Sequence, residues 1–394
     1  MNALERLLRL EEREKTERGL VHTPNEIAQQ PETWIRTFQF FQQRRGEIRD
    51  FLGAAGIGTS QEHKPTVFLI GAGTSDYVGR CLEQLLRRRW KTEVVAVPST
   101  HLVTHAEEQL VPGQRYLWIS FSRSGDSPEG VAVLERALKR HPNIHHLVVS
   151  CNKDGQMVQL SAGLKQALPI CLHDEVNDRG LAMTSSFSNM VVFGQCLAHI
   201  FQPDEYSQII ERMGFAAETF LPTAADCAAQ LAGKGYQKVF FVGSGPLAAV
   251  ARECALKLME LTAGATQTMW ESSLGLRHGP MAALKPEDLL VCLVSSDERV
   301  RRYDLDLLSE IGRKQLVNAR VVVGGSPRAA VNGLAEHYLA PEVSSPLADD
   351  YRPPVDVIFG QLLGLFSSLR WNLKPDTPSP TGAISRVVGG VKIY

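Results

Sequence analysis

The chain has 394 residues, of which 44% are hydrophobic and 22% charged, and 42 Lys and Arg stand against 43 Asp and Glu. This length predicts two or three domains that each bury their own core, which excludes a single small module and a disordered chain. The net charge of -1 offers no general attraction to nucleic acid or to an anionic membrane, so neither is an expected partner and any anionic ligand must be held locally.

Residues 1–46 are expected to form an N-terminal helical arm. Residues 1–19 are rich in Glu and Arg, with leucines at helical spacing, and lack the apolar centre of a signal peptide. The sequence Thr23-Pro24-Asn25-Glu26 is typical of a helix start, because Thr caps, Pro takes the first position and Glu reaches back to the cap.

The rest of the chain contains a degenerate duplication with a period of about 172 to 174 residues, the size of a domain. The matched stretches are residues 67–74 with 239–246, 118–122 with 292–296, and 146–150 with 320–324. Continuous apolar strands alternate with helical patterns, which predicts parallel sheets covered on both faces. We therefore expect two doubly wound α/β domains, residues 47–202 and 207–373, followed by a Pro- and Gly-rich loop at residues 374–394.

Ligands of doubly wound folds bind beyond the carboxyl ends of the strands, and two hydroxyl-rich turns occupy such places in the first copy. Residues 71–75 and 122–127 each follow a strand and lead into a helix. A single Ser or Thr there is usually only a cap, but two such turns in one sheet favour a phosphate cradle of N–H and OH groups. The candidate ligands are Thr74, Ser75, Ser122, Arg123, Ser124 and Ser127.

Neither glycine turn completes a dinucleotide fingerprint, since Asp76 and Ala248 stand where the third glycine belongs. The second copy has Ser296-Asp297-Glu298 in place of the serine turn, and this acidic pair is expected to repel phosphate. The sequence therefore predicts a phosphate site in the first domain only.

The second copy carries charged residues instead. Glu253, Lys257 and Glu260 share one helix face, which is usually a solvated salt-bridge stripe. Here the intervening positions are apolar and the helix follows the glycine turn, which favours a polar face in a ligand cleft. Of the histidines, His278 is the candidate for chemistry, because the following Gly279-Pro280 fixes its loop.

Seven cysteines are scattered and lack the close pairs of a zinc site or a redox dithiol, which indicates the reducing cytoplasm and no bound metal. The most apolar windows, residues 190–201 and 355–369, contain polar side chains and are too short to cross a bilayer.

Gly-Thr-Ser after the first strand, the Ser-x-Ser-Gly turn, and Glu-x-x-x-Lys-x-x-Glu followed by His-Gly-Pro resemble tandem sugar isomerase (SIS) domains. The likeness is greatest to AgaS-type galactosamine-6-phosphate deaminase/isomerases, as judged from segments 31–36, 270–280, 303–308 and 375–388. The resemblance implies two flavodoxin-like domains and a cofactor-free enzyme whose ligand is a phosphorylated amino sugar. It also implies a homo-oligomer, a dimer or larger.

Under this resemblance the hydroxyl-rich turns bind the sugar phosphate, and Ala182 offers a backbone contact to the sugar hydroxyls. Glu260 moves a proton between C1 and C2 beside Lys257, and His278 opens the ring, in such enzymes from a neighbouring subunit.

The lysine of the family's C-terminal loop falls at Arg386, in a tail expected over the active site. An arginine forms no Schiff base and serves only as a cation. Glu271 is a reserve candidate, either as the acid for the leaving amine or as a structural partner of Arg277.

The implied reaction converts galactosamine 6-phosphate to tagatose 6-phosphate and ammonia, by C1/C2 proton transfer and ketimine hydrolysis. Two alternatives stay open: an aldose/ketose isomerase that releases no ammonia, and a non-catalytic phosphosugar-sensing regulator. Glu260 and His278 favour catalysis, and no motif encodes the sugar epimer.

Overall fold

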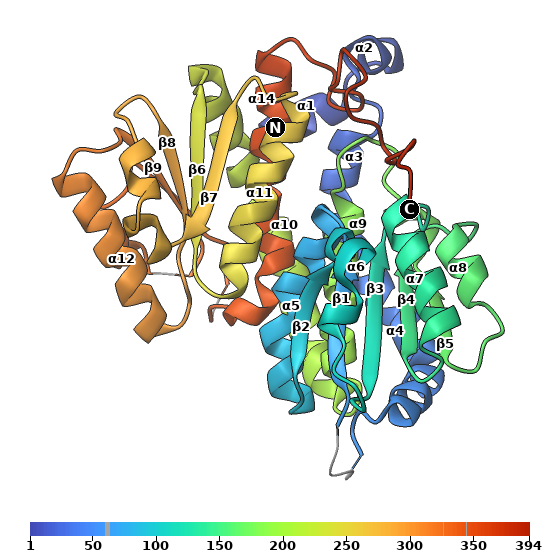
Figure 1. Cartoon of the computed structure of the whole chain (residues 1–394). Coiled ribbons are helices and arrows are strands. Elements are labelled where there is room, and N and C mark those ends of the chain that lie inside the picture. Colours follow the sequence, from blue (N-terminus) through green and yellow to red (C-terminus); the bar gives the residue numbers. More distant parts are fainter. Residues whose placement is uncertain (60–63, 326, 344) are drawn as a thin grey trace. The chain divides into compact units, whose positions relative to one another are not determined.

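The computed structural model describes residues 1–59, 64–325, 327–343 and 345–394, which divide into two compact units (Figure 1). The first-repeat unit comprises Glu32–Asp178, Ser185–Ile210 and Ile384–Tyr394. The second-repeat unit comprises Met1–Pro31, Arg179–Thr184 and Glu211–Ala383. Each unit contains one parallel sheet with helices on its faces.

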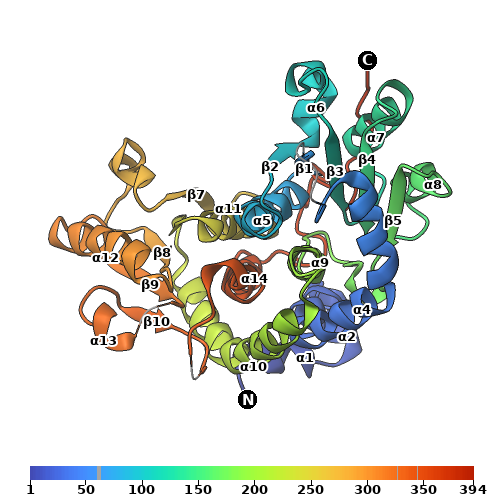
Figure 2. The same cartoon turned by 90° about the horizontal axis from the view of Figure 1, so that it is seen from below.

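The first-repeat sheet has the strand order β2-β1-β3-β4-β5, all parallel, which is the flavodoxin order. Helices α6 and α7 cover one face through an apolar cluster around Phe68 and Trp118, while α5 and α9 pack together on the other (Figure 2). The elements are β1 Thr66–Gly71, α5 Thr74–Trp90, β2 Val94–Pro98, α6 Ser99–His105, β3 Tyr116–Ser122, α7 Pro128–Arg140, β4 His145–Ser150, α8 Gln156–Ser161, β5 Ala167–Cys171 and α9 Ser185–Ala198.

The second-repeat sheet has the order β10-β9-β8-β6-β7, which is the same topology once its strands are counted from β6. Helix α12 covers one face through a core around Phe240 and Leu308, and α11 packs against α14. The elements are β6 Lys238–Gly243, α11 Pro246–Leu261, β7 Gln267–Ser272, β8 Leu289–Leu293, α12 Glu298–Arg313, β9 Ala319–Val323, α13 Arg328–Val331, β10 His337–Leu339 and α14 Pro353–Arg370. The predicted pair of doubly wound α/β folds is confirmed.

The same close helix contact recurs in both repeats. A Cβ on Gly194 of α9 would lie 2.1 Å from Leu82 of α5, and a Cβ on Gly360 of α14 would lie 2.4 Å from Cys254 of α11. Leu82 and Cys254 occupy corresponding helix positions, so the duplication extends to the packing of each helix pair.

The strand register corrects one of the three predicted matches between the copies. Val67 pairs with Leu117, and its counterpart Val239 pairs with Leu289, so residue 117 corresponds to 289. The predicted match of 118–122 with 292–296 is therefore wrong by two residues. A shift of two leaves every side chain on the same face of its strand, so the apolar pattern did not reveal it.

Residues 1–46, which were expected to form the N-terminal arm, contain helices, but the last of these continues past residue 46. The helices are α1 Ala3–Leu8, α2 Glu12–Arg18, α3 Thr23–Ala28 and α4 Gln30–Ala55. Thr23 begins α3, but the expected capping box is wrong. The carboxylate of Asp376 caps the helix instead, accepting bonds from the Thr23 N–H and hydroxyl at 2.8 Å each. The tail has no helix or strand, as its Pro and Gly content predicted.

Helix α10, Pro203–Lys234, connects the two repeats in sequence. Among the residues that the structure describes, no helix is long and apolar enough to cross a membrane. The same residues include no group of three or more His, Cys, Asp or Glu that could hold a metal ion.

Candidate functional site

The first hydroxyl-rich turn joins β1 to α5 and requires glycine. A Cβ on Gly71 would lie 2.2 Å from the carbonyl carbon of Ser75, and Gly73 has φ of 55°. The turn brings the buried Thr74 and Ser75 to the N-terminus of a 17-residue helix. Backbone N–H groups and two hydroxyls therefore lie together at the carboxyl edge of the sheet.

The second turn, after β3, is shaped by its own serines. The Ser122 hydroxyl accepts a bond from the Gly125 N–H at 3.0 Å, and the Ser124 hydroxyl accepts one from the Asp126 N–H at 3.1 Å. Ser127 takes the N-cap position of α7, where it makes no side-chain cap bond. The paired strands β1 and β3 carry the two turns at the same edge.

Two arginines join the serine turn from different parts of the chain. The buried Arg123 donates a hydrogen bond to the backbone carbonyl of Arg386 in the C-terminal tail. The Arg386 guanidinium donates to the Asp178 carbonyl at 2.7 Å and to Asn177 Oδ1 at 2.6 Å. The tail is thus anchored beside the turn, and two guanidinium groups supply the positive charge that a phosphate dianion favours.

The loops after β4 and β5 complete this edge, and sequence reasoning missed their residues. Asn152 donates from its amide to the Ser124 carbonyl at 2.9 Å, and a Cβ on Gly155 would lie 2.5 Å from that same oxygen. Asp178 accepts bonds from the N–H groups of Ser185 and Ser186 at the start of α9. The signal was available, since polar residues follow neighbouring parallel strands at one edge.

In the second repeat, Glu253, Lys257 and Glu260 lie on one face of α11. The Lys257 ammonium is 2.5 Å from Glu260 Oε2 and 3.5 Å from Glu253 Oε1. Lys257 and Glu253 are fully buried, so a solvated salt-bridge stripe is the wrong interpretation of this triplet. The Glu260 side chain keeps 23% of its surface exposed, and it is the member that can reach a ligand.

The histidine loop follows β7. His278 is exposed, and its ring forms no hydrogen bond or ion pair within the described parts of the chain. Glu271 accepts bonds from the Ser272 N–H at 2.7 Å and hydroxyl at 3.1 Å.

Arg277 forms its ion pairs with residues of α12 and not with Glu271. Its guanidinium lies 2.7 Å from Glu310 and 2.8 Å from Asp306. Hydrogen bonds from Lys314 and Arg277 lower the pKa of Glu310 to about 2. The suggested structural pairing of Glu271 with Arg277 is therefore wrong, and Arg277 fixes the histidine loop to α12.

Ala182 is buried in a short loop of the second-repeat unit, residues 179–184, which is held from two sides. The Glu26 carboxylate of α3 accepts the Gly180 N–H at 3.1 Å, and the Asp376 carbonyl of the tail accepts the Leu181 N–H at 3.0 Å. Glu26 thus positions this loop.

The amino-acid sequence is similar over nearly its full length to characterised enzymes. The D-galactosamine-6-phosphate deaminase AgaS of Escherichia coli is 34% identical over 374 residues, which cover 94% of this chain and 95% of that protein. The chain belongs to the AgaS family. No family model matches it.

Two solved structures place the AgaS-family chain among phosphosugar enzymes by fold. The tagatose-6-phosphate ketose/aldose isomerase of Escherichia coli matches with a TM-score of 0.84 and 32% identity, over 94% of this chain and 96% of that one. The C-terminal domain of glucosamine-fructose-6-phosphate aminotransferase from Francisella tularensis matches with a TM-score of 0.75 over 90% of this chain and 98% of that one. At 18% identity the second match supports the fold alone.

In this AgaS-family chain the candidate residues fall into two groups. The first-repeat unit brings together Thr74, Ser75, Ser122, Arg123, Ser124, Ser127 and Arg386. The second-repeat unit carries Ala182, Lys257, Glu260 and His278. The candidate phosphate ligands thus lie in one unit, and the candidate acid/base residues lie in the other.

Proposed function

We propose that this protein is a D-galactosamine-6-phosphate deaminase that releases tagatose 6-phosphate and ammonia. The names of its AgaS relative and of the solved tagatose-6-phosphate isomerase support this substrate and this product. The observation that carries the proposal is the ion pair between the buried Lys257 and the partly exposed Glu260, 2.5 Å apart, on a helix that follows a glycine turn. A buried cation that pairs with an accessible carboxylate is typical of an acid/base site.

The phosphate group of the substrate binds in the first repeat. The hydroxyl-rich turns donate through backbone N–H and OH groups, and Arg123 adds a charge-assisted bond. Arg386 serves as a fixed cation, because a guanidinium cannot act as a Schiff-base amine. The Ala182 loop offers its backbone to the sugar hydroxyls.

Proton transfer is the task of the second repeat. His278 assists ring opening, which exposes the C1 aldehyde and acidifies the C2 hydrogen. Glu260 removes that proton and returns it to C1, and the enolamine becomes a ketimine at C2. Water then adds to the C=N bond, ammonia leaves, and the ketone of tagatose 6-phosphate remains. Lys257 orients the Glu260 carboxylate and offsets its charge.

His278 acts across a subunit boundary in a homo-oligomer. Its ring is exposed and forms no hydrogen bond with the residues that the structure describes, which is consistent with a partner outside its own unit. Mixing Glu260→Gln and His278→Ala chains tests this directly, since hybrid oligomers regain activity only if one subunit supplies the histidine to the other. No recovery in verified hybrids would place His278 in its own chain's site.

The proposed reaction is tested by measuring ammonia and tagatose 6-phosphate from galactosamine 6-phosphate, with glucosamine 6-phosphate as the epimeric control. We expect equal amounts of both products and a kcat/KM at least about tenfold higher for the galactosamine substrate, since one or two hydrogen bonds at C4 distinguish the epimers. The solved neighbour's name favours a plain aldose/ketose isomerase as the second candidate. Interconversion of tagatose 6-phosphate with an aldose, without ammonia from either amino sugar, would establish that alternative instead.

A further inference from the structure

The second repeat has its own turn at the place where the first repeat has the serine turn. Ser120 and Cys292 occupy corresponding positions in β3 and β8. From these positions the chain reaches the N-cap Ser127 in the first repeat and the N-cap Asp297 in the second, which makes the second turn two residues shorter. This turn still carries two hydroxyls, those of Ser295 and Ser296.

The acidic pair in this turn does not explain why it would lack a phosphate. Asp297 accepts the Val300 N–H at 3.0 Å and caps α12, and Glu298 pairs with Arg302 at 2.7 Å. Both carboxylates are therefore engaged along the helix and do not fill the turn.

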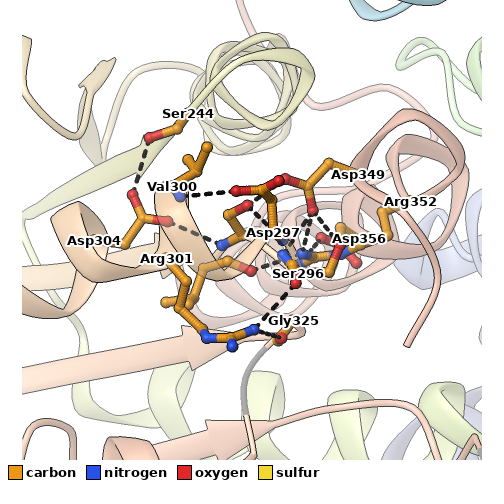
Figure 3. Close-up of polar contacts among 12 residues, drawn as sticks. Ser244, Ser296, Asp297, Val300, Arg301, Asp304, Gly325, Asp349, Arg352 and Asp356 are labelled. Atoms are coloured by element: carbon orange, nitrogen blue, oxygen red, sulfur yellow. Dashed lines mark hydrogen bonds and ion pairs between the residues drawn. The ribbon is translucent and has the colours of Figure 1, made fainter. Parts of the chain in front are cut away.

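A carboxylate from a distant segment fills the turn instead (Figure 3). Asp349 Oδ1 accepts bonds from the Ser296 N–H at 2.8 Å and the Ser296 hydroxyl at 2.7 Å, and Oδ2 accepts the Ser295 hydroxyl. The guanidinium of Arg352 donates to the same carboxylate at 3.1 Å. One backbone N–H, two hydroxyls and one arginine thus converge on an anion, which is the donor set of a phosphate cradle.

Arg352 is held firmly in this arrangement. It is 3% exposed and donates to the Val294 carbonyl at 2.6 Å, to the Val323 carbonyl at 3.2 Å and to Asp356 at 2.6 Å. The guanidinium is therefore preorganised by the ends of β8 and β9 and by α14. It keeps a carboxylate partner, Asp356, if Asp349 is removed.

The connection from the last strand to the following helix carries carboxylates in both repeats, but it acts on the turn in different ways. Between β5 and α9, a short helical turn at Asp174–Val176 leads to Asn177 and Asp178, which hold the cationic Arg386 beside the first serine turn. Between β10 and α14, the corresponding turn at Asp349–Tyr351 supplies the anion itself. One repeat surrounds its turn with positive charge, and the other neutralises it internally.

We propose that Ser295, Ser296 and Arg352 form a phosphate-type anion site in the second repeat, and that Asp349 occupies it as an internal ligand. Asp349 thereby restricts phosphosugar binding to the first repeat. Its side chain is 16% exposed, so its removal connects the donors to solvent and lets an external anion replace it.

The test counts bound inorganic phosphate by equilibrium dialysis at constant ionic strength. The first site is disabled by Arg123→Ala/Ser124→Ala, so that the result does not depend on the proposed function. In this background we expect no phosphate bound to the otherwise unchanged chain, and one phosphate per chain after Asp349→Ala. Asp349→Glu, which restores a carboxylate, should lower the phosphate affinity of the opened site at least tenfold.

Asp297→Ala is the matched control, because it removes one negative charge from the same turn and leaves Asp349 in place. An equal gain of phosphate binding in this control would show a charge effect alone and overturn the proposal. So would binding in the Asp349-containing background, or a folded Asp349→Ala chain that binds none.

If Asp349→Ala does not fold in chloride, its folded yield is compared in phosphate and in chloride of equal ionic strength. A ligand that binds the folded state alone raises stability by mass action, so recovery in phosphate supports the internal-ligand role. Equal yields in both salts contradict it.

Discussion

The turns after β3 and β8 start from the same topology and end with opposite electrostatics. In the first repeat the turn carries Arg123, and Arg386 is anchored beside it. In the second repeat Asp349 occupies the turn. The duplicated sheet thus keeps a hydroxyl-bearing turn at the same place in both repeats, while one loop residue, Asp349, gives the second turn an internal carboxylate partner.

The helix that follows the first strand of each sheet also differs between the repeats, and here the charged residues are in the second repeat. These helices are α5, after β1, and α11, after β6. Cys81, Leu85 and Arg88 of α5 correspond to Glu253, Lys257 and Glu260 of α11. The buried positions are apolar in α5 and charged in α11. Burying charges costs stability even when they are paired, so their presence in one copy alone is best explained by chemistry performed there.

The largest expected effect comes from removing the proposed acid/base residue of the second repeat. Glu260→Gln should lower ammonia release from galactosamine 6-phosphate by about 10²- to 10⁴-fold, the usual contribution of a general acid/base, while substrate affinity in the first repeat changes little. Kinetics and a binding titration measure the two separately. Arg88→Gln, the matched change in α5, should leave turnover intact. Full turnover in Glu260→Gln would remove this residue from the base role.

Replacing residues of α11 by their counterparts in α5 tests how much the buried charges of α11 lower the free energy of unfolding. Lys257→Leu leaves two carboxylates without their cation and should lower the free energy of unfolding by about 3–5 kcal/mol. Glu253→Cys/Lys257→Leu, which reproduces Cys81 and Leu85, should regain most of that stability and stay inactive. Chemical denaturation of both variants provides the comparison. A double variant less stable than Lys257→Leu would contradict this account.

One buried group in each repeat should make acid act on stability in opposite directions. Burial, aided by His145 and His141, lowers the pKa of His146 in β4 to about 3. Burial raises the pKa of Asp356 in α14 to about 6. Between about pH 6 and 4 the unfolded chain binds the extra proton at His146, so acid destabilises the first repeat. In the same window the folded chain binds the extra proton at Asp356, so the titration of this group makes acid stabilise the second.

Substitution of each group separates the two opposing dependences of folding stability on pH. His146→Phe should remove a loss of folding stability on acidification. Asp356→Asn should remove a gain of folding stability on acidification. Each effect is on the order of 1 kcal/mol per pH unit. Denaturation midpoints across about pH 4 to 6 measure these slopes. Slopes that do not change in either variant would show that these groups titrate alike in the folded and unfolded chain.

The smallest effects come from a matched pair of serines. Ser124→Ala should raise KM for the phosphosugar by about two- to tenfold, the value of one neutral hydrogen bond. Ser296→Ala should leave KM unchanged and lower stability by about 1 kcal/mol, because its hydroxyl binds Asp349 and no substrate. Steady-state kinetics and thermal melts distinguish the two. A KM effect at Ser296 would contradict the closed state of the second turn.

The sequence by itself determined the parts of this protein that depend on periodicity and on short spacing. Apolar strands alternating with helical patterns revealed the duplication and both sheets. Hydroxyls after a strand marked the turn at Ser122, and spacings of four and three marked the face of Glu253, Lys257 and Glu260. These signals are local, so they can be read from one stretch of chain.

Only the tertiary structure decided the contacts between distant segments. Thr23 and Asp376, which caps its helix, are 353 positions apart, and Ser296 and Asp349 are 53 apart. The tail also places Arg386 beside Arg123, and Arg277 binds α12 in place of Glu271. No periodicity links such residues, because their proximity follows from strand order and helix packing. For the same reason the register of β8 was ambiguous by two residues until its pairing with β6 was known.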